Sequence, residues 1–400
     1  MKLHPNQTYN YYKKAFHNIE MPFAFVDIDR FDDNVKAIAD RAGNKKIRIA
    51  TKSIRCVGLM QRILKSNSKF QGIMAYNAKE AAWLSQQGFD DILIGYPCFQ
   101  KSDIEVVVHE LKKGKQITLM IDLPEHVQHI NAIGELYNCI IPVCIDIDMS
   151  SKFPGLHFGV LRSSIQTTES AMALFKIIQQ SKFVKLHGLM GYEAQIAGLK
   201  DAVPGKFLMN SFIAMLKKYS INEIQQRRKI IVEVLQQQGA PFSFINGGGT
   251  GSLEYTSKED IVTEVTVGSG FYCPGLFDYF SNFQHYPSAG FAIEIVRKPK
   301  ENVFTCAGGG YIASGKAGSD KLPKPFLPTG ARLVDNEGAG EVQTPIQYSG
   351  NEQLQIGDPV FLRHAKAGEL CERFQHLYLI SNGEVVDKVN TYRGELQCFL

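Results

Sequence analysis

A repeated unit of a short apolar run, a polar turn and a helical stretch extends from Ile47 to Cys273 and constrains the fold more than any other feature. Eight apolar runs have the length and composition of strands, and they cover residues 47–51, 70–76, 91–96, 116–121, 139–147, 184–192, 242–246 and 262–268. Helical periodicity lies between them, including residues 58–65, 78–87, 104–112, 168–180 and a long segment, 206–238, that could be two helices. Eight βα units in series predict an α/β fold, a (β/α)8 TIM-type barrel, with an open two-layer sheet as the structural alternative.

The character of the chain changes after Tyr279. Short strand-like runs at 291–296, 303–306, 311–313, 359–362, 377–380 and 384–389 are separated by Gly, Pro and Asn, which predicts a C-terminal all-β domain. Within it, the three prolines of segment 315–328 indicate a loop. A strand at 23–28 and a helix at 31–41 precede the barrel strands. We therefore expect an N-terminal extension over 1–22, the barrel domain over 23–285 and the β domain over 286–400.

Composition excludes several classes of function. The chain has 400 residues, of which 44% are hydrophobic and 21% charged, and this is typical of a globular protein. Its net charge of +4 is spread along the sequence, so we expect no nucleic-acid partner. The eight cysteines form no CxxC pair, which favours reduced thiols. Residues 1–10 lack an apolar signal segment and no apolar run reaches about 18 residues, so we expect a cytoplasmic protein with no membrane association.

Polar side chains recur at the carboxyl ends of the predicted strands, where barrels of this kind build their active sites. Lys52 ends the first strand, and the ends of later strands carry Asn77, Asp122, Asp146, Asp148, Tyr192, Glu193, Gln195 and Asn246. Each residue taken singly is more often a turn or helix-cap residue, and a strand-end Lys is more often simply solvated. Their repetition at one end of the barrel favours an active site that contains Lys52.

The segment Asn246-Gly247-Gly248-Gly249-Thr250-Gly251-Ser252 follows the seventh predicted strand. It fits neither a Walker loop nor GxGxxG. Glycines let backbone N–H groups approach an anion, and the start of a following helix would add positive charge. Loops after strands seven and eight commonly hold phosphate in barrels, although a tight turn is the ordinary alternative. Tyr272, after strand eight, could add a phenol hydrogen bond. An amine and a phosphate loop together describe a pocket for a phosphorylated aldehyde such as pyridoxal phosphate.

Four segments carry a resemblance to a known family: 21–29, 48–52, 188–195 and 247–252. In that order they resemble the fold-type III pyridoxal-phosphate enzymes of the alanine racemase-like group, nearest to the branch of D-threonine aldolase and D-serine dehydratase. The resemblance implies that Lys52 forms a Schiff base with the cofactor. It further implies a homodimer, in which the β domain of one subunit closes the other's active site, and cofactor contacts from Arg48, Tyr192, Gln195, Gly248, Gly249, Thr250 and Tyr272.

Two segments depart from the pattern of this branch. Where members often have an Arg two residues before Gly-Val, this chain has His157-Phe158-Gly159-Val160 followed by Arg162, so either His157 or Arg162 could face the cofactor ring. The branch binds a divalent metal through a His and an Asp or Cys two positions later, whereas here Lys366 follows His364. An ammonium group cannot ligate a metal, so either the ion is lost or it recruits Glu369 or Cys371. In the first case Lys366 would replace its charge near the substrate, unless Lys366 is a surface residue and His364 a structural one.

These observations predict a pyridoxal-phosphate-dependent lyase for a small D-configured or 3-hydroxy amino acid, acting by aldol cleavage or by dehydration. Lys52 or His364 would serve as the base. An amino-acid racemase is the alternative within the family, with Tyr311 as its second base. A non-catalytic pyridoxal-phosphate carrier lacks a β domain, which counts against it. The substrate side chain, its stereochemistry and the partner of the pyridine nitrogen stay open.

Overall fold

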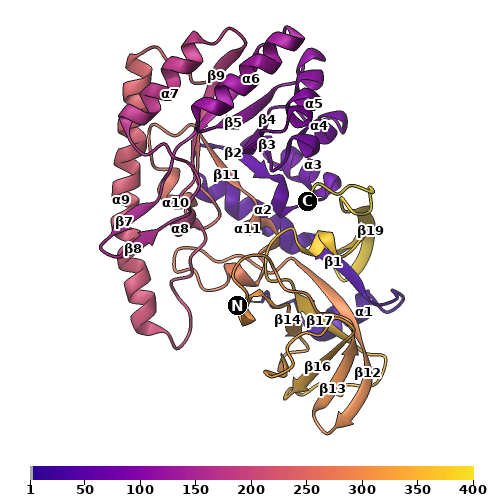
Figure 1. Ribbon diagram of the computed structural model, residues 1–400. Helices are drawn as coiled ribbons and strands as arrows, with labels where there is room; N and C mark the ends of the chain where they lie inside the picture. The colour runs from indigo at the N-terminus through magenta and orange to yellow at the C-terminus, as the bar shows by residue number, and fades with distance from the viewer. Residues whose placement is uncertain (1–2) are drawn as a thin grey trace. The chain divides into compact units, whose positions relative to one another are not determined.

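The computed structural model describes residues 3–400, which divide into two compact units (Figure 1). The sheet unit comprises the chain up to Ile38 with residues 53–61 and 269–398, and the barrel unit comprises residues 39–52, 62–268 and 399–400. Neither unit is continuous in sequence, whereas the predicted domains are. No helix in the described part of the chain is long and apolar enough to cross a membrane.

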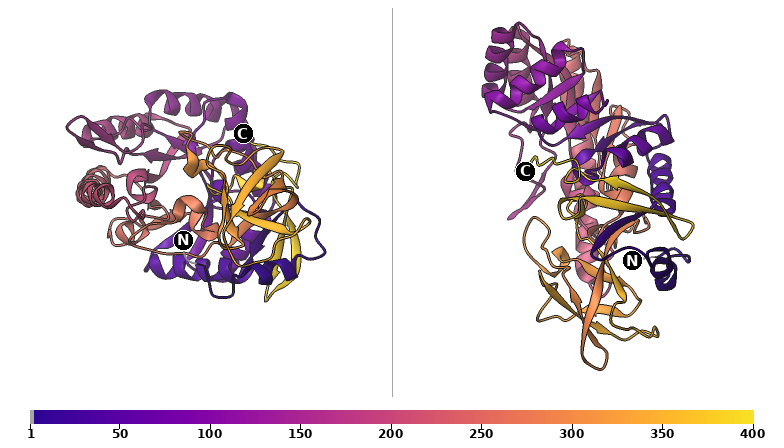
Figure 2. Two further views of the ribbon diagram at one scale, coloured as in Figure 1. Left: turned by 90° about the horizontal axis from the view of Figure 1, so that it is seen from below. Right: turned by 90° about the vertical axis from the view of Figure 1, so that its right-hand side faces the viewer.

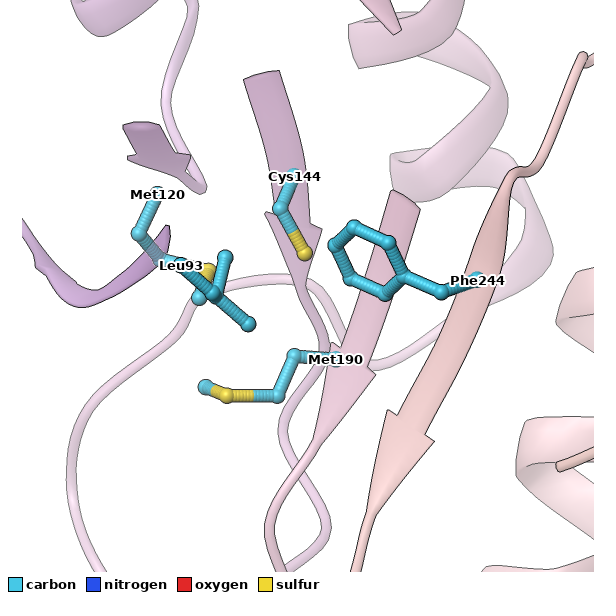
Figure 3. Packing of buried hydrophobic residues seen from close by; sticks show 5 residues of the cluster. All are labelled: Leu93, Met120, Cys144, Met190 and Phe244. Carbon is cyan, nitrogen blue, oxygen red and sulfur yellow. The ribbon is translucent and has the colours of Figure 1, made fainter. Parts of the chain in front are cut away.

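The barrel unit contains a closed parallel barrel, which confirms the predicted TIM-type fold. Its strands occur in the order β10-β11-β2-β3-β4-β5-β6-β9 around the barrel. Their bounds are β2 Lys46–Ala50, β3 Phe70–Ala75, β4 Ile92–Pro97, β5 Ile117–Ile121, β6 Ile141–Asp146, β9 Val184–Gly191, β10 Phe244–Gly247 and β11 Glu264–Val267. Inward-facing side chains from five neighbouring strands pack together in its interior, namely Leu93, Met120, Cys144, Met190 and Phe244 (Figure 3). The barrel is therefore filled by side chains, and reactive groups must lie at its ends.

Helices connect the barrel strands: α2 Ile28–Arg41, α3 Val57–Ser66, α4 Ala78–Gln86, α5 Lys101–Lys112, α6 Pro124–Tyr137, α7 Thr168–Gln180, α8 Ala194–Ala197, α9 Phe207–Gln237, α10 Leu253–Thr256 and α11 Ser269–Tyr272. Local sequence explains several boundaries. Thr167 and Ser170 form a capping box at the start of α7, and Asn77 caps α4, so Asn77 has the ordinary role of a strand-end Asn. Segment 206–238 forms one helix, α9, rather than two. A short hairpin, β7 Ser151–Phe153 and β8 Leu156–Phe158, follows β6.

The sheet unit is built around a nine-stranded sheet with the path β15-β16-β13-β12-β1-β18-β19, while β17 pairs with β12 and β14. The bounds are β1 Phe23–Asp27, β12 Ala289–Lys300, β13 Val303–Ala307, β14 Lys324–Leu327, β15 Ala331–Leu333, β16 Gln343–Tyr348, β17 Pro359–Arg363, β18 His376–Ser381 and β19 Glu384–Asn390. The short helix α1, Tyr9–Ala15, lies in the same unit.

Three features of the sheet unit differ from expectation. The strand predicted at 23–28, β1, pairs with β12 and β18, and all five of its residues are buried, as suits an interior strand. The segment predicted as a loop at 315–328 contains β14, which pairs with β17 despite Pro325. Residues 311–313, predicted as a strand, form none, because left-handed Gly308 and Gly309 turn the chain just before them.

Candidate active site

The mouth of the barrel brings Lys52 together with two tyrosines and an arginine. Lys52 lies in a single 3-10 turn, Thr51–Ser53, directly after β2. Its Nζ donates a hydrogen bond of 2.8 Å to the hydroxyl of Tyr96, near the end of β4. The Arg162 guanidinium lies 5.5 Å from the Tyr96 ring centroid and 5.7 Å from that of Tyr192, which follows β9. Lys52 is exposed, so its amine is accessible at the end of the barrel where chemistry is expected.

The glycine loop, Gly247–Ser252, continues this run of contacts. Gly248 has φ +83°, a left-handed conformation that favours glycine. A Cβ added at Gly249 would lie 2.7 Å from the Ala197 Cβ and 3.0 Å from a ring carbon of Tyr192. Glycine is therefore required for the loop to pack this closely against Tyr192. The Lys52 amine and the glycine loop are thus linked across the barrel mouth through Tyr96, Arg162 and Tyr192.

A buried charge network fixes the glycine loop from below. Arg228 of α9 is fully buried and donates 2.9 Å hydrogen bonds to the Gly191 carbonyl and to Glu193, and another to Glu259. Burial opposes the charge of Arg228, but Glu193 and Glu259 outweigh it and raise the pKa of the guanidinium. Glu193 in turn accepts hydrogen bonds from the Gly248 N–H, at 3.3 Å, and from the Thr256 hydroxyl. The loop is therefore held in a defined position before any ligand binds.

The amide groups of the loop are partly used within the protein. The Gly248 N–H binds Glu193 and the Gly249 N–H binds the Ser252 hydroxyl at 3.0 Å. The Thr250 carbonyl accepts a 2.6 Å hydrogen bond from Arg41. The helix expected to follow the loop is only α10, four residues long, so the expected helix contribution to anion binding is wrong. Phosphate binding by Gly248, Gly249 and Thr250 stays a prediction.

A small cavity beside Arg162 is lined by acidic residues from the end of β6. Asp146 and Asp148 face it, together with Ile147, Met149, Val160, Arg162, Ser163, Met190 and Tyr192. Asp148 accepts hydrogen bonds from Ser150 and Gln166, whereas no hydrogen bond to the Asp146 carboxylate occurs within residues 3–400. Burial and the nearby Asp122 raise the pKa of Asp146 to about 8, although Arg162 acts in the opposite direction. Asp146 is therefore mainly a neutral acid at pH 7.

Other predicted residues of the barrel unit lie away from the mouth or are engaged in structural contacts. The five N–H groups of Arg48 make five hydrogen bonds, to the side chains of Glu264 and Asp91 and to the carbonyls of Ile73 and Asp91. The Gln195 amide donates to the Met149 carbonyl at 2.6 Å and to the Ser220 hydroxyl at 2.9 Å. His157 is exposed on the β7–β8 hairpin. Of the pair His157 and Arg162, the structure places Arg162 at the mouth.

Three predicted residues gather within the sheet unit. The Tyr272 hydroxyl donates a 2.9 Å hydrogen bond to the Ile54 carbonyl and lies 3.9 Å from the Cys371 sulfur. The rings of Tyr272 and His364 meet edge to face, with centroids 6.0 Å apart. His364 is buried with neither ring nitrogen hydrogen-bonded, and burial and Arg363 lower its pKa to about 3. Its imidazole is therefore neutral at physiological pH.

Lys366 contacts a neighbouring loop of the sheet unit. Its Nζ donates to the Ser314 hydroxyl at 2.6 Å and to the Ser314 carbonyl at 3.2 Å. Glu369 accepts a hydrogen bond from the N–H of the same serine. Within residues 3–400, no three His, Cys, Asp or Glu side chains gather as a metal site. Whether a metal binds stays open, and so does the proposed substitution of its charge by Lys366.

Two functional residues were not identified from the sequence. Tyr96 is the last residue of the predicted strand 91–96, so its place at the barrel end could have been recognised. Arg228 lies within a continuous helix, and its partners Glu193 and Glu259 are 35 and 31 residues away. No local sequence signal points to Arg228.

Comparison with known proteins identifies the family. Residues 26–274 match the family described as alanine racemase, N-terminal domain. The chain belongs to this family. The predicted membership in the alanine racemase-like, fold-type III group of pyridoxal-phosphate enzymes is thereby confirmed. The match covers the barrel strands and the mouth residues described above.

Relatives of the alanine racemase-like group include two aldolases. The 3-hydroxy-D-aspartate aldolase of Paracoccus denitrificans is 21% identical over 253 residues, 63% of this chain and 60% of that protein. The D-threonine aldolase of an Arthrobacter species is 20% identical over 267 residues, 66% of this chain and 63% of that protein. The match thus spans less than two thirds of the length of these curated relatives.

Solved structures of this alanine racemase-like group share the fold of both units. The D-threonine aldolase from Filomicrobium marinum has a TM-score of 0.80 at 15% identity, over 94% of this chain and 96% of that chain. The D-threo-3-hydroxyaspartate dehydratase from Delftia sp. HT23 has a TM-score of 0.75 at 16% identity, over 94% and 98%. At these identities the comparison shows the fold alone.

Proposed function

We propose that this chain is a pyridoxal-phosphate-dependent lyase that acts on a D-configured or 3-hydroxy amino acid and attaches its cofactor through Lys52. The observation that carries the proposal is the position of Lys52. Its accessible amine lies at the carboxyl end of the first barrel strand, in a run of contacts that ends at the glycine loop. The relatives named for aldolase and dehydratase activity on 3-hydroxy D-amino acids support the substrate class.

The residues at the barrel mouth fit pyridoxal phosphate. Lys52 offers the amine, the glycine loop offers close backbone approach for the phosphate, and the Tyr96 and Tyr192 rings with Arg162 offer a surface between them. The neutral Asp146 faces the adjoining cavity without a hydrogen-bond partner within residues 3–400. When bound, the cofactor supplies an electron sink for the negative charge that develops at the substrate Cα.

The chain's own residues would orient the substrate and move protons. Tyr96 accepts a hydrogen bond from Lys52 and so fixes the position of the amine. Lys52 is the residue that we propose as base, since a positioned amine can take or return a proton at the substrate. Arg162, exposed between two tyrosine rings, can bind an anionic group of the substrate or the cofactor. A second proposed base, His364, is buried with a pKa of about 3, which suits a neutral proton acceptor of low basicity.

We also propose a homodimer and a cytoplasmic location. The eight cysteines are all free thiols within the described residues, which supports a reducing compartment. The racemase alternative requires a second base, and Tyr311 does not favour it. The Tyr311 hydroxyl is buried, burial raises its pKa further, and the Arg373 guanidinium covers its ring at 5.2 Å.

A substrate panel tests the proposed activity. Purified protein supplied with pyridoxal phosphate is incubated with D- and L-3-hydroxy amino acids, and aldehyde, ammonia and enantiomer ratio are measured. We expect aldehyde or ammonia from a D-substrate. Lys52→Ala should lower kcat/KM by about a thousandfold or more, because a covalent catalytic group is lost. The matched control Lys182→Ala, which removes a lysine that contacts the Phe183 ring, should keep full activity. Racemisation without aldehyde or ammonia would contradict the lyase proposal.

A further inference from the structure

The N-terminal half of α9 carries apolar side chains that the protein does not cover. Six of them are between 48% and 83% exposed: Phe207, Leu208, Met209, Phe212, Met215 and Tyr219. We call these six residues the α9 patch. Figure 1 shows that this end of α9 continues past the β7–β8 hairpin, and the left view of Figure 2 looks nearly along the helix at the edge of the barrel unit. A surface of this kind is unusual for a helix whose only role is to cover a barrel.

The spacing of the patch is that of a helix-pairing seam. Leu208, Phe212, Met215 and Tyr219 are separated by four, three and four residues, so they lie along one face of the helix. A different face of α9 packs on the barrel unit, through the buried residues Leu216, Ser220, Ile224 and Arg228. The helix therefore has two apolar faces, of which one is satisfied within the chain. A 4–3–4 seam is the pattern by which one helix packs against another.

The helix is held rigidly enough to present this seam. The Ser220 hydroxyl lies 2.7 Å from the Ser151 hydroxyl of β7, and the Tyr219 ring packs 5.2 Å from the Phe153 ring of the same hairpin. Lys217 is buried and binds Asp201 at 3.0 Å and the Leu199 carbonyl at 2.5 Å. These contacts fix the helix on the side opposite to the seam. Pairing would then require little ordering of the chain.

Area and charge identify the partner. Large apolar side chains cover about 150–250 Å² each, so the patch presents on the order of 800 Å², which is one partner's share of a standard interface. Residues 207–216 contain no charged side chain, and the nearest charges, Lys206 and Lys218, stand at the two ends. A patch without charge can face a copy of itself without opposing like charges at its centre, as a two-fold interface requires.

We propose that the α9 patch is the surface through which two copies of this chain associate, helix against helix, about a two-fold axis. This proposal names the surface of the dimer and is independent of the catalytic activity. Because its core is apolar and its end charges are alike, the association should not weaken as salt is added. An anionic membrane surface, the other occupant that a Lys-flanked apolar helix could take, would bind more weakly in salt.

Sedimentation of the full chain across a dilution series tests the proposal. Leu208→Glu and Met215→Glu place a carboxylate in the seam, and Leu136→Glu, at a 63% exposed position on α6, is the matched control. We expect the wild type and Leu136→Glu to sediment at twice the mass of either patch variant at the same concentration. The dissociation constant should rise about 30-fold or more when a central interface residue is lost. Circular dichroism establishes that each variant is folded.

Three results would overturn it. One is a wild type that stays monomeric at every concentration. The second is a folded Met215→Glu variant and a folded Leu208→Glu variant that both keep the wild-type mass. The third is a monomeric wild type that binds vesicles of anionic lipid through Met215, with binding that decreases as salt is added. If one variant fails to fold, the other and the salt series of the wild type still decide the question.

Discussion

Replacing Arg228 by Met should destabilise the protein strongly, because Arg228 carries the network under the glycine loop. The guanidinium is fully buried and binds Glu193, Glu259 and the Gly191 carbonyl. Methionine removes these hydrogen bonds and leaves two buried carboxylates without a cation. Breaking a buried ion pair in this way costs about 3–5 kcal/mol. We expect the free energy of unfolding of Arg228→Met to fall by that amount.

Urea unfolding followed by circular dichroism measures this change. Lys229→Met is the matched control: its side chain is 66% exposed and pairs only with Glu233, so the loss should stay below about 0.5 kcal/mol. Lower pH should protect Arg228→Met, because protonation neutralises the orphaned Glu193 and Glu259, so its deficit should be smaller at pH 5 than at pH 8. Adding Glu259→Gln should restore part of the stability. The reasoning fails if Arg228→Met unfolds within about 1 kcal/mol of the control.

Three further changes test other parts of the account. Asp146→Asn should gain stability over the wild type as pH rises from about 4 to 8: the carboxyl has a pKa of about 8 when folded and an ordinary value of 3.8, so the native state binds the extra proton and loses stability across that window; parallel melting temperatures at all pH values would contradict this. Gly249→Ala should cost about 1–3 kcal/mol and weaken phosphate binding, because its Cβ would meet Ala197 at 2.7 Å, whereas the control Gly58→Ala, whose Cβ meets nothing closer than 3.6 Å, should not; equal melting temperatures would refute it. Arg48→Met should lower the free energy of unfolding by about 3–5 kcal/mol without preventing cofactor attachment in the folded protein, since Arg48 serves the barrel interior; loss of attachment in a variant of near wild-type stability would show a direct cofactor role.

The barrel could be predicted because its period is local. Each βα unit announces itself through an apolar run and a helical stretch, and the predicted strands overlap all eight barrel strands. The assignment of β1 could not be made in this way. Its partners β12 and β18 lie far along the chain, and an apolar run looks the same in either unit. Strand β14 was missed for a related reason, since Pro325 is tolerated where β14 pairs with β17 only.

The candidate site shows the same division between local and distant information. Lys52, Tyr192 and the glycine loop follow strands directly, so the rule for barrel ends placed them together. Whether a polar side chain is available depends on partners that sequence does not reveal. Arg48 is engaged by Asp91 and Glu264, which are 43 and 216 residues away. The choice of Arg162 over His157 likewise required the positions of the rings of Tyr96 and Tyr192.

Borohydride reduction of the protein with bound pyridoxal phosphate, followed by peptide mass mapping, tests the central claim most directly. The reagent fixes the cofactor to the amine that holds it, and the exposed Lys52 Nζ at the barrel mouth is that amine in this account. We predict one labelled peptide, which contains Lys52, and no label in Lys52→Ala. A cofactor-bound protein in which Lys52 is unlabelled, or in which another lysine carries the label, would contradict the account.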